Sequence, residues 1–253
     1  MLPELIYREG KQDNYILLAL LGLSSGLLGY IAATVAFPSD VSILAVVFAS
    51  IPLLYPLTRT FLEDEREDGR PHFEEIRIYG SLFLGEVAAF FLLAILVSPE
   101  NLSIQVSQYA AQLESLGVST IGGSSIQAVV TGSAASPSAF LSVLINNLLV
   151  FGIILVVSAV ISSSGAFILV WNASVLGTFM GFLAKKLSAA HSVVYIPHAT
   201  LEMLGFIVAG VSGSLISAAV YRKHFERDTW IDYLKLVSLG LGLILLAAVI
   251  ETA

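Results

Sequence analysis

The stretch that decides the fold class is residues 140–183, FLSVLINNLLVFGIILVVSAVISSSGAFILVWNASVLGTFMGFL, which contains no acidic or basic residue. A membrane-crossing helix needs about 20 mainly apolar residues. The stretch is long enough for two such helices, divided at the SSSG turn of residues 162–165. Over the whole chain only 12% of residues are charged, against about 25% in an average soluble domain. The sequence therefore predicts an all-α, polytopic transmembrane helix bundle.

Hydrophobic runs predict seven spans within a single transmembrane domain that covers residues 1–253. The fourth and fifth runs are separated only by the SSSG turn, so six spans with one re-entrant segment is the alternative. Pro52 and Pro56 lie inside the second run and are expected to kink that helix or end it early. The predicted spans are Tyr15–Phe37, Val41–Phe61, Ile78–Val97, Phe140–Ser162, Gly165–Leu183, Tyr195–Tyr221 and Ile231–Glu251.

The distribution of lysine and arginine predicts the orientation, because cytoplasmic loops carry an excess of both residues. With the N-terminus in the cytoplasm, every lysine and arginine except Lys185 and Lys186 lies on the cytoplasmic side. We therefore expect a multi-pass protein of the cell membrane with a cytoplasmic N-terminus. Residues 62–77 then form a charged cytoplasmic loop, and residues 98–139 form an extracytoplasmic loop.

The extracytoplasmic loop holds no lysine or arginine and is rich in small and polar residues. A helical spacing within it fits a short helix on the membrane surface, and a loosely ordered loop is the equal alternative. The apolar residues that would share one face of that helix are Val106, Tyr109, Leu113 and Leu116.

Polar side chains inside the spans are costly in a bilayer, and they mark places where helices bind a ligand or each other. Depth counted at about 1.5 Å per residue puts Glu86 and Asn172 in one layer toward the cytoplasm. The other polar residues fall in a second layer toward the outer face. The predicted polar intramembrane cluster comprises Glu86, Asn146, Asn147, Asn172, His198, Glu202 and Glu251.

His198 and Glu202 are four residues apart and therefore lie on the same face of a helix. Three roles are open for this pair. The first is a hydrogen-bonded clamp within the bundle. The second is a proton or cation relay, because histidine titrates near neutral pH. The third is one half of a metal or acid–base site. One histidine with one or two carboxylates provides fewer ligands than a typical metal site. His198 and Glu202 are therefore weak candidates for metal ligands, and no metal is identified.

The sequence lacks the residues that several classes of protein need for their function. The chain has no cysteine, which excludes thiolate chemistry, and it lacks the HExxH motif of metalloproteases. Its net charge of −7 disfavours nucleic-acid binding. No catalytic residue and no cofactor are predicted.

Small residues recur at four-residue spacing in the fifth and sixth spans, as Gly177 with Gly181 and as Gly205, Ala209 and Gly213. Such stripes allow helix backbones to approach closely. We expect these glycines to pack helices within the bundle, with contact between copies of the chain as the second choice.

Residues 146–181, residues 195–210 (YIPHATLEMLGFIVAG) and the closing Ile250-Glu251 resemble the stage II sporulation protein M (SpoIIM) family. The resemblance covers roughly residues 140–253. Ala173 and Ala199 depart from the family pattern, which has glycine there. The matching positions are Asn147, Asn172, Gly177, Pro197, His198, Glu202 and Glu251.

The resemblance implies a membrane scaffold, which in endospore formers works with cell-wall hydrolases that are separate proteins. The leading hypothesis is therefore a non-enzymatic scaffold in the lipid bilayer that assembles with itself or with other membrane proteins. The alternative is a proton- or cation-coupled transporter or channel that uses Glu86, His198 and Glu202. An intramembrane hydrolase comes third.

Overall fold

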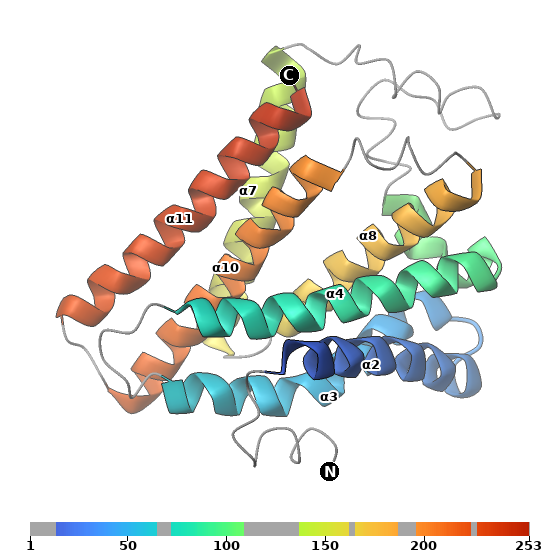
Figure 1. Ribbon diagram of the computed structural model, residues 1–253, viewed down its shortest axis with the longest axis horizontal. Helices are drawn as coiled ribbons and strands as arrows, with labels where there is room; N and C mark the ends of the chain where they lie inside the picture. Colours follow the sequence, from blue (N-terminus) through green and yellow to red (C-terminus); the bar gives the residue numbers. More distant parts are fainter. Residues whose placement is uncertain are drawn as a thin grey trace.

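The computed structural model describes residues 14–64, 72–108, 137–161, 165–186, 196–223 and 227–252, and these residues form helices and short turns without a strand. Residues 103–108 are helical and follow directly on a short 3-10 helix, η1. The helices in chain order are α2 (Tyr15–Ala36), α3 (Val41–Asp64), α4 (Phe73–Leu96), η1 (Pro99–Leu102), α7 (Pro137–Val160), α8 (Gly165–Lys186), α10 (Ile196–Arg222) and α11 (Arg227–Thr252), as Figure 1 shows.

Six of these helices are long and apolar enough to cross a membrane: α2, α4, α7, α8, α10 and α11. The predicted all-α membrane bundle is therefore confirmed, and α7 and α8 are two separate helices on either side of the SSSG turn. The sequence predicts seven spans, and the predicted span that is missing from the six is the second, which corresponds to α3; its apolar part covers only Val41–Leu54. The helix itself continues through Pro52 and Pro56 to Asp64, as membrane helices do when neighbours or waters satisfy the freed backbone groups.

The helices form two groups by their contacts, and in Figure 1 α10 and α11 of the second group are inclined to α2 and α4 of the first. In the first group α4 packs between α2 and α8, and α3 covers α2 and part of α8. In the second group α10 packs against both α7 and α11. The second group meets the first mainly where α10 contacts α3, α4 and α8. Helix α8 thus belongs to the first group although it lies between α7 and α10 in sequence.

Glycines bring α2, α4 and α8 into direct backbone contact. A methyl group on Gly85 of α4 would meet the carbonyl oxygen of Ala19 in α2, and one on Gly22 would meet that of Leu82. On the other side of α4, methyl groups on Gly177 and Gly181 of α8 would meet the carbonyl oxygens of Val87 and Phe91. Because no larger residue fits at such contacts, these glycines set the spacing of the three helices.

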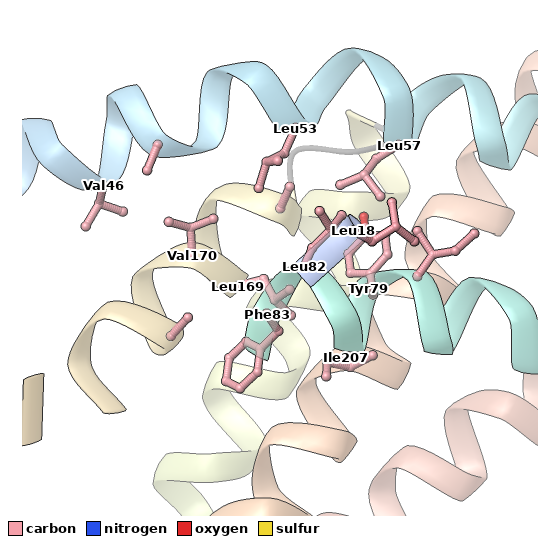
Figure 2. Close-up of a cluster of buried hydrophobic side chains, with 14 of the residues drawn as sticks. Leu18, Val46, Leu53, Leu57, Tyr79, Leu82, Phe83, Leu169, Val170 and Ile207 are labelled. Carbon is pink, nitrogen blue, oxygen red and sulfur yellow. The ribbon is translucent and has the colours of Figure 1, made fainter. Parts of the chain in front are cut away.

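Buried side chains from both groups meet in one apolar core (Figure 2). Helix α3 contributes Leu53 and Leu57, which lie close to Tyr79 and Leu82 of α4. Leu169 and Val170 of α8 line the same region, and Ile207 of α10 belongs to the same core. This core joins α10 to the first group.

At Ser158 of α7 the three helices α7, α8 and α10 are in close contact. Its side chain is completely buried, and methyl groups on Gly165 of α8 and Gly213 of α10 would both collide with it. A methyl group on Gly165 would also lie 3.6 Å from Cα of Gly210 in α10. From this crossing α8 and α10 diverge toward the opposite end of the bundle (Figure 1).

Candidate functional site

Three residues of the predicted polar cluster, one from each of three helices, line a single cavity between α7, α8 and α10. They are Asn146 of α7, Asn172 of α8 and Glu202 of α10, and the cavity has a volume of about 440 Å³ and is partly open. This volume is within the roughly 300–1,000 Å³ of ordinary small-molecule sites. The remaining lining residues are Ile43, Gln108, Val150, Ile153, Phe167, Ile168, Trp171, Val175 and Phe206.

Helical periodicity explains which residues reach the cavity. Asn146, Val150 and Ile153 are spaced four and three residues apart on α7, so one face of that helix lines the cavity. The neighbouring Asn147 lies on a different face, with Phe151 one turn further on, and it is buried. The pair Asn146-Asn147 therefore divides between the cavity and the packed interior of α7, α10 and α11.

The two asparagine side chains in the cavity are oriented by hydrogen bonds. Asn172 Nδ2 donates to the carbonyl oxygen of Ile168, one turn earlier in α8, at 2.8 Å. Asn146 Nδ2 donates to Oδ1 of Asn147 at 3.4 Å. Each cavity asparagine thus directs one N–H to its own helix, which leaves the second N–H and the amide oxygen for other partners.

Glu251 at the end of α11 lies close enough to Glu202 for the two carboxylates to repel each other. His198 is one turn before Glu202 on α10 and is partly buried. In the described part of the chain, no group of three or more histidine, aspartate or glutamate side chains is arranged to hold a metal ion. The sequence-predicted residues around Glu202 thus form a polar site with two side-chain amides and two neighbouring carboxyl groups.

Glu86 lies apart from this cavity. Its side chain is completely buried in α4, and neither carboxyl oxygen has a hydrogen-bond partner among the described residues. It lines a small space of about 10 Å³ together with Tyr79, Leu82 and residues of α3 and α8, enough for about one water molecule. Gly26 of α2 makes room for it, because a methyl group there would lie 2.6 Å from Glu86 Oε2. Asn172 therefore joins Asn146 and Glu202 in the structure, whereas Glu86 occupies the other pocket.

The segment after α4 contributes a polar contact that the sequence reasoning missed. Gln105 is completely buried, and it accepts a hydrogen bond from Ser42 Oγ at 2.5 Å. Its Nε2 donates to the backbone oxygen of Ser42 at 3.0 Å and to Ser174 Oγ at 3.3 Å. The contacts fix residues 98–108 against α3 and α8.

Gln108 follows Gln105 by almost one turn and lines the cavity. The fixed segment therefore borders the site. Residues 103–108 are helical, as the surface-helix alternative predicts for this part, whereas Tyr109, Leu113 and Leu116 fall outside the described residues. A lone glutamine in a polar loop carries no periodic signal, so only the three-dimensional packing identifies this contact.

Glycines of α10 hold the other two helices of its group. A methyl group on Gly205 would lie 2.8 Å from Ile244 Cδ1 of α11, and one on Gly213 would meet the carbonyl oxygen of Leu155 in α7. Gly205 and Gly213 thus lie at helix contacts within the chain, as do Gly177 and Gly181 of α8 where that helix packs on α4.

The fold and the cavity define a class: a multi-pass, all-α membrane protein with a polar cavity among its C-terminal helices. The profile of the family Stage II sporulation protein M (SpoIIM) matches residues 78–253, and the chain belongs to this family. The match begins within α4 and includes every helix that lines the cavity except α3. Searches of curated proteins and of solved structures find no match to the chain.

Proposed function

We propose that this SpoIIM-family protein is a non-enzymatic membrane scaffold whose cavity between α7, α8 and α10 serves as a binding site. The observation that carries the proposal is the convergence of Asn146, Asn172 and Glu202 on one cavity. Three polar groups from three helices give a ligand directional contacts within an otherwise apolar lining, which is the usual composition of a binding site.

The tight crossing at Ser158 supports binding over conduction. Ser158 follows Asn146 by twelve residues on α7, or about 18 Å along the helix, and there α7, α8 and α10 are in close contact through Gly165 and Gly213. Glu86 and Glu202 line different cavities. A relay needs groups that exchange a proton or an ion along a connected path, and this separation disfavours such a path.

The assembly surface that we propose lies on α7 and α11. Only 22% of the apolar window of α7 and 28% of that of α11 are buried, against 72% for α10. The exposed faces include Leu149 and Val156 of α7. This surface is available to the lipid bilayer, to a second copy of the chain or to another membrane protein, and the scaffold proposal assigns part of it to a second copy.

A disulfide cross-linking experiment tests the scaffold role, since the chain contains no cysteine of its own. We expect Val156→Cys to form a disulfide-linked dimer in liposomes, because an isologous contact brings the same residue of two copies together. Leu28→Cys on α2 is the matched control, with an exposed fraction of 64% against 60% for Val156, and it should remain monomeric.

Two results would contradict the scaffold proposal. One is equal cross-linking of Val156→Cys and Leu28→Cys, which random collisions would produce. The other is a proton or cation flux into vesicles that contain the protein but not into protein-free vesicles. Loss of such a flux in a folded Glu202→Gln variant would establish the transporter instead.

For the orientation we propose a cytoplasmic N-terminus, supported by the lysine and arginine distribution. Both Ser107 and Arg227 are exposed. A membrane-impermeant maleimide should label Ser107→Cys in intact cells, and it should label Arg227→Cys only after the membrane is permeabilised. The reverse labelling pattern would contradict this orientation.

A further inference from the structure

The hydrogen-bonding capacity of the cavity is biased toward acceptors. Asn146 and Asn172 each use one amide N–H on a neighbouring group of the chain, so each has one further N–H and its amide oxygen for a ligand. The carboxylate of Glu202 adds two acceptor oxygens when ionised. A ligand that satisfies all three side chains must therefore bring several N–H or O–H donors of its own.

The charged groups in and near the cavity also favour a ligand with a positively charged donor group. None of the described lining residues is lysine, arginine or histidine, and Glu251 adds a second carboxylate near Glu202. His198 of α10 is the described basic group nearest to Glu202 in sequence, and it does not line the cavity. A bound cation would relieve the repulsion between Glu202 and Glu251.

The apolar part of the lining separates an organic cation from a metal ion. The volume of about 440 Å³ is far more than one metal ion fills. Phe167, Ile168 and Phe206 supply apolar walls, and Trp171 supplies an aromatic face. Aromatic faces attract ammonium groups, and tryptophan does so most strongly.

We propose that this cavity binds an alkylammonium group, that is, a protonated primary amine joined to an apolar chain. Glu202 and the amide oxygens of Asn146 and Asn172 hold the ammonium group, and the chain lies along the apolar wall. The inference rests on the proposed function of the cavity as a binding site. Two sources share this chemistry: the amine headgroup of a membrane lipid and a free organic amine.

Tryptophan fluorescence provides the test, because the chain has only two tryptophans. Trp230 packs edge-on against Tyr233 at a centroid distance of 6.0 Å near the start of α11, remote from the cavity, so Trp230→Phe isolates the signal of Trp171. In nanodiscs of glycerol-headgroup lipids, hexylammonium should bind about tenfold or more tightly than hexanol, and hexanesulfonate should not bind. A hexanol affinity equal to that of hexylammonium would overturn the proposal.

Glu202→Gln should weaken hexylammonium binding by about tenfold to a hundredfold, the usual effect of losing a charge-assisted hydrogen bond. Glu86→Gln is the matched control, since it alters the buried carboxyl group outside this cavity and should leave the affinity unchanged. If Glu202→Gln does not fold, Asn172→Leu replaces it, and a several-fold loss is expected. An unchanged affinity in the folded Glu202 or Asn172 variant would overturn the proposal.

Changing the lipid identifies the source. If a lipid headgroup occupies the cavity, hexylammonium should bind more weakly in nanodiscs of ethanolamine-headgroup lipids, because those lipids compete. If the ligand is a free amine, the two affinities should be equal, and both results support an ammonium site. Equal binding of hexanol and hexylammonium would refute the ammonium ligand. If Val156→Cys still cross-links specifically, the scaffold proposal stands. If the protein does not self-associate, or if it conducts ions, the scaffold proposal is refuted as well.

Discussion

Gly85→Ala is expected to destabilise the protein strongly, and Gly80→Ala on the same helix is expected to leave its stability unchanged or slightly higher. A methyl group on Gly85 would collide with the backbone of Ala19 and Leu23 in α2, whereas one on Gly80 meets nothing within 4 Å. Backbone atoms cannot rotate away as a side chain does, so α2 and α4 must separate. Overpacking of this kind costs about 1–3 kcal/mol or more.

The measurement is the midpoint of thermal unfolding in detergent for both variants and the unchanged chain. Gly80→Ala removes backbone freedom at an uncrowded helix position, which is worth about 0.5–1 kcal/mol in favour of the folded state. Similar midpoints for the two alanine variants would show that α2 and α4 are not in backbone contact at Gly85.

Gln105→Ala has the second large expected effect, a loss of about 3 kcal/mol in the free energy of unfolding. The substitution removes the partner of Ser42 and Ser174 and leaves a cavity where a completely buried side chain was. Unpaired buried polar groups cost about 1–3 kcal/mol, and the cavity adds to that cost.

Ser107→Ala is the control for Gln105→Ala, because Ser107 belongs to the same helical segment and is exposed. Among the described residues its hydroxyl donates to Ile104 of its own turn, and an exposed substitution usually changes stability by less than about 0.5 kcal/mol. Gln105→Ala should also loosen residues 98–108 at the edge of the cavity, which faster ligand exchange would report. Equal unfolding midpoints for the two variants would contradict the buried role of Gln105.

The helices could be predicted from the sequence because the length of an apolar run is a one-dimensional property. The predicted span Tyr15–Phe37 and the helix Tyr15–Ala36 differ by one residue, and the predicted and observed starts of α8 coincide at Gly165. The predicted third span begins at Ile78, whereas α4 begins at Phe73. Its first turn carries Glu74 and Glu75, which suit the positive end of a helix dipole but lower the local hydropathy.

The partners of the polar residues were harder to predict. Counting residues along parallel helices puts Glu86 and Asn172 at equal depth, but α8 is inclined to α10 and diverges from it (Figure 1). The cavity lies between these diverging helices, and Asn172 lines it together with Asn146 and Glu202. Gln105 shows the same limit, since a single polar residue outside the spans gives no sign of its burial.

The position of α8 in the chain has a consequence for synthesis. The face of α4 that receives Gly177 and Gly181 is made early, yet the helix that covers it is made only after α7. N-terminal parts fold first during translation. That face of α4 is therefore not covered by α8 until α7 has been inserted and α8 has been synthesised. Assembly of the first three helices is therefore finished by a later helix, and α8 ties the early and late halves of the chain into one folding unit.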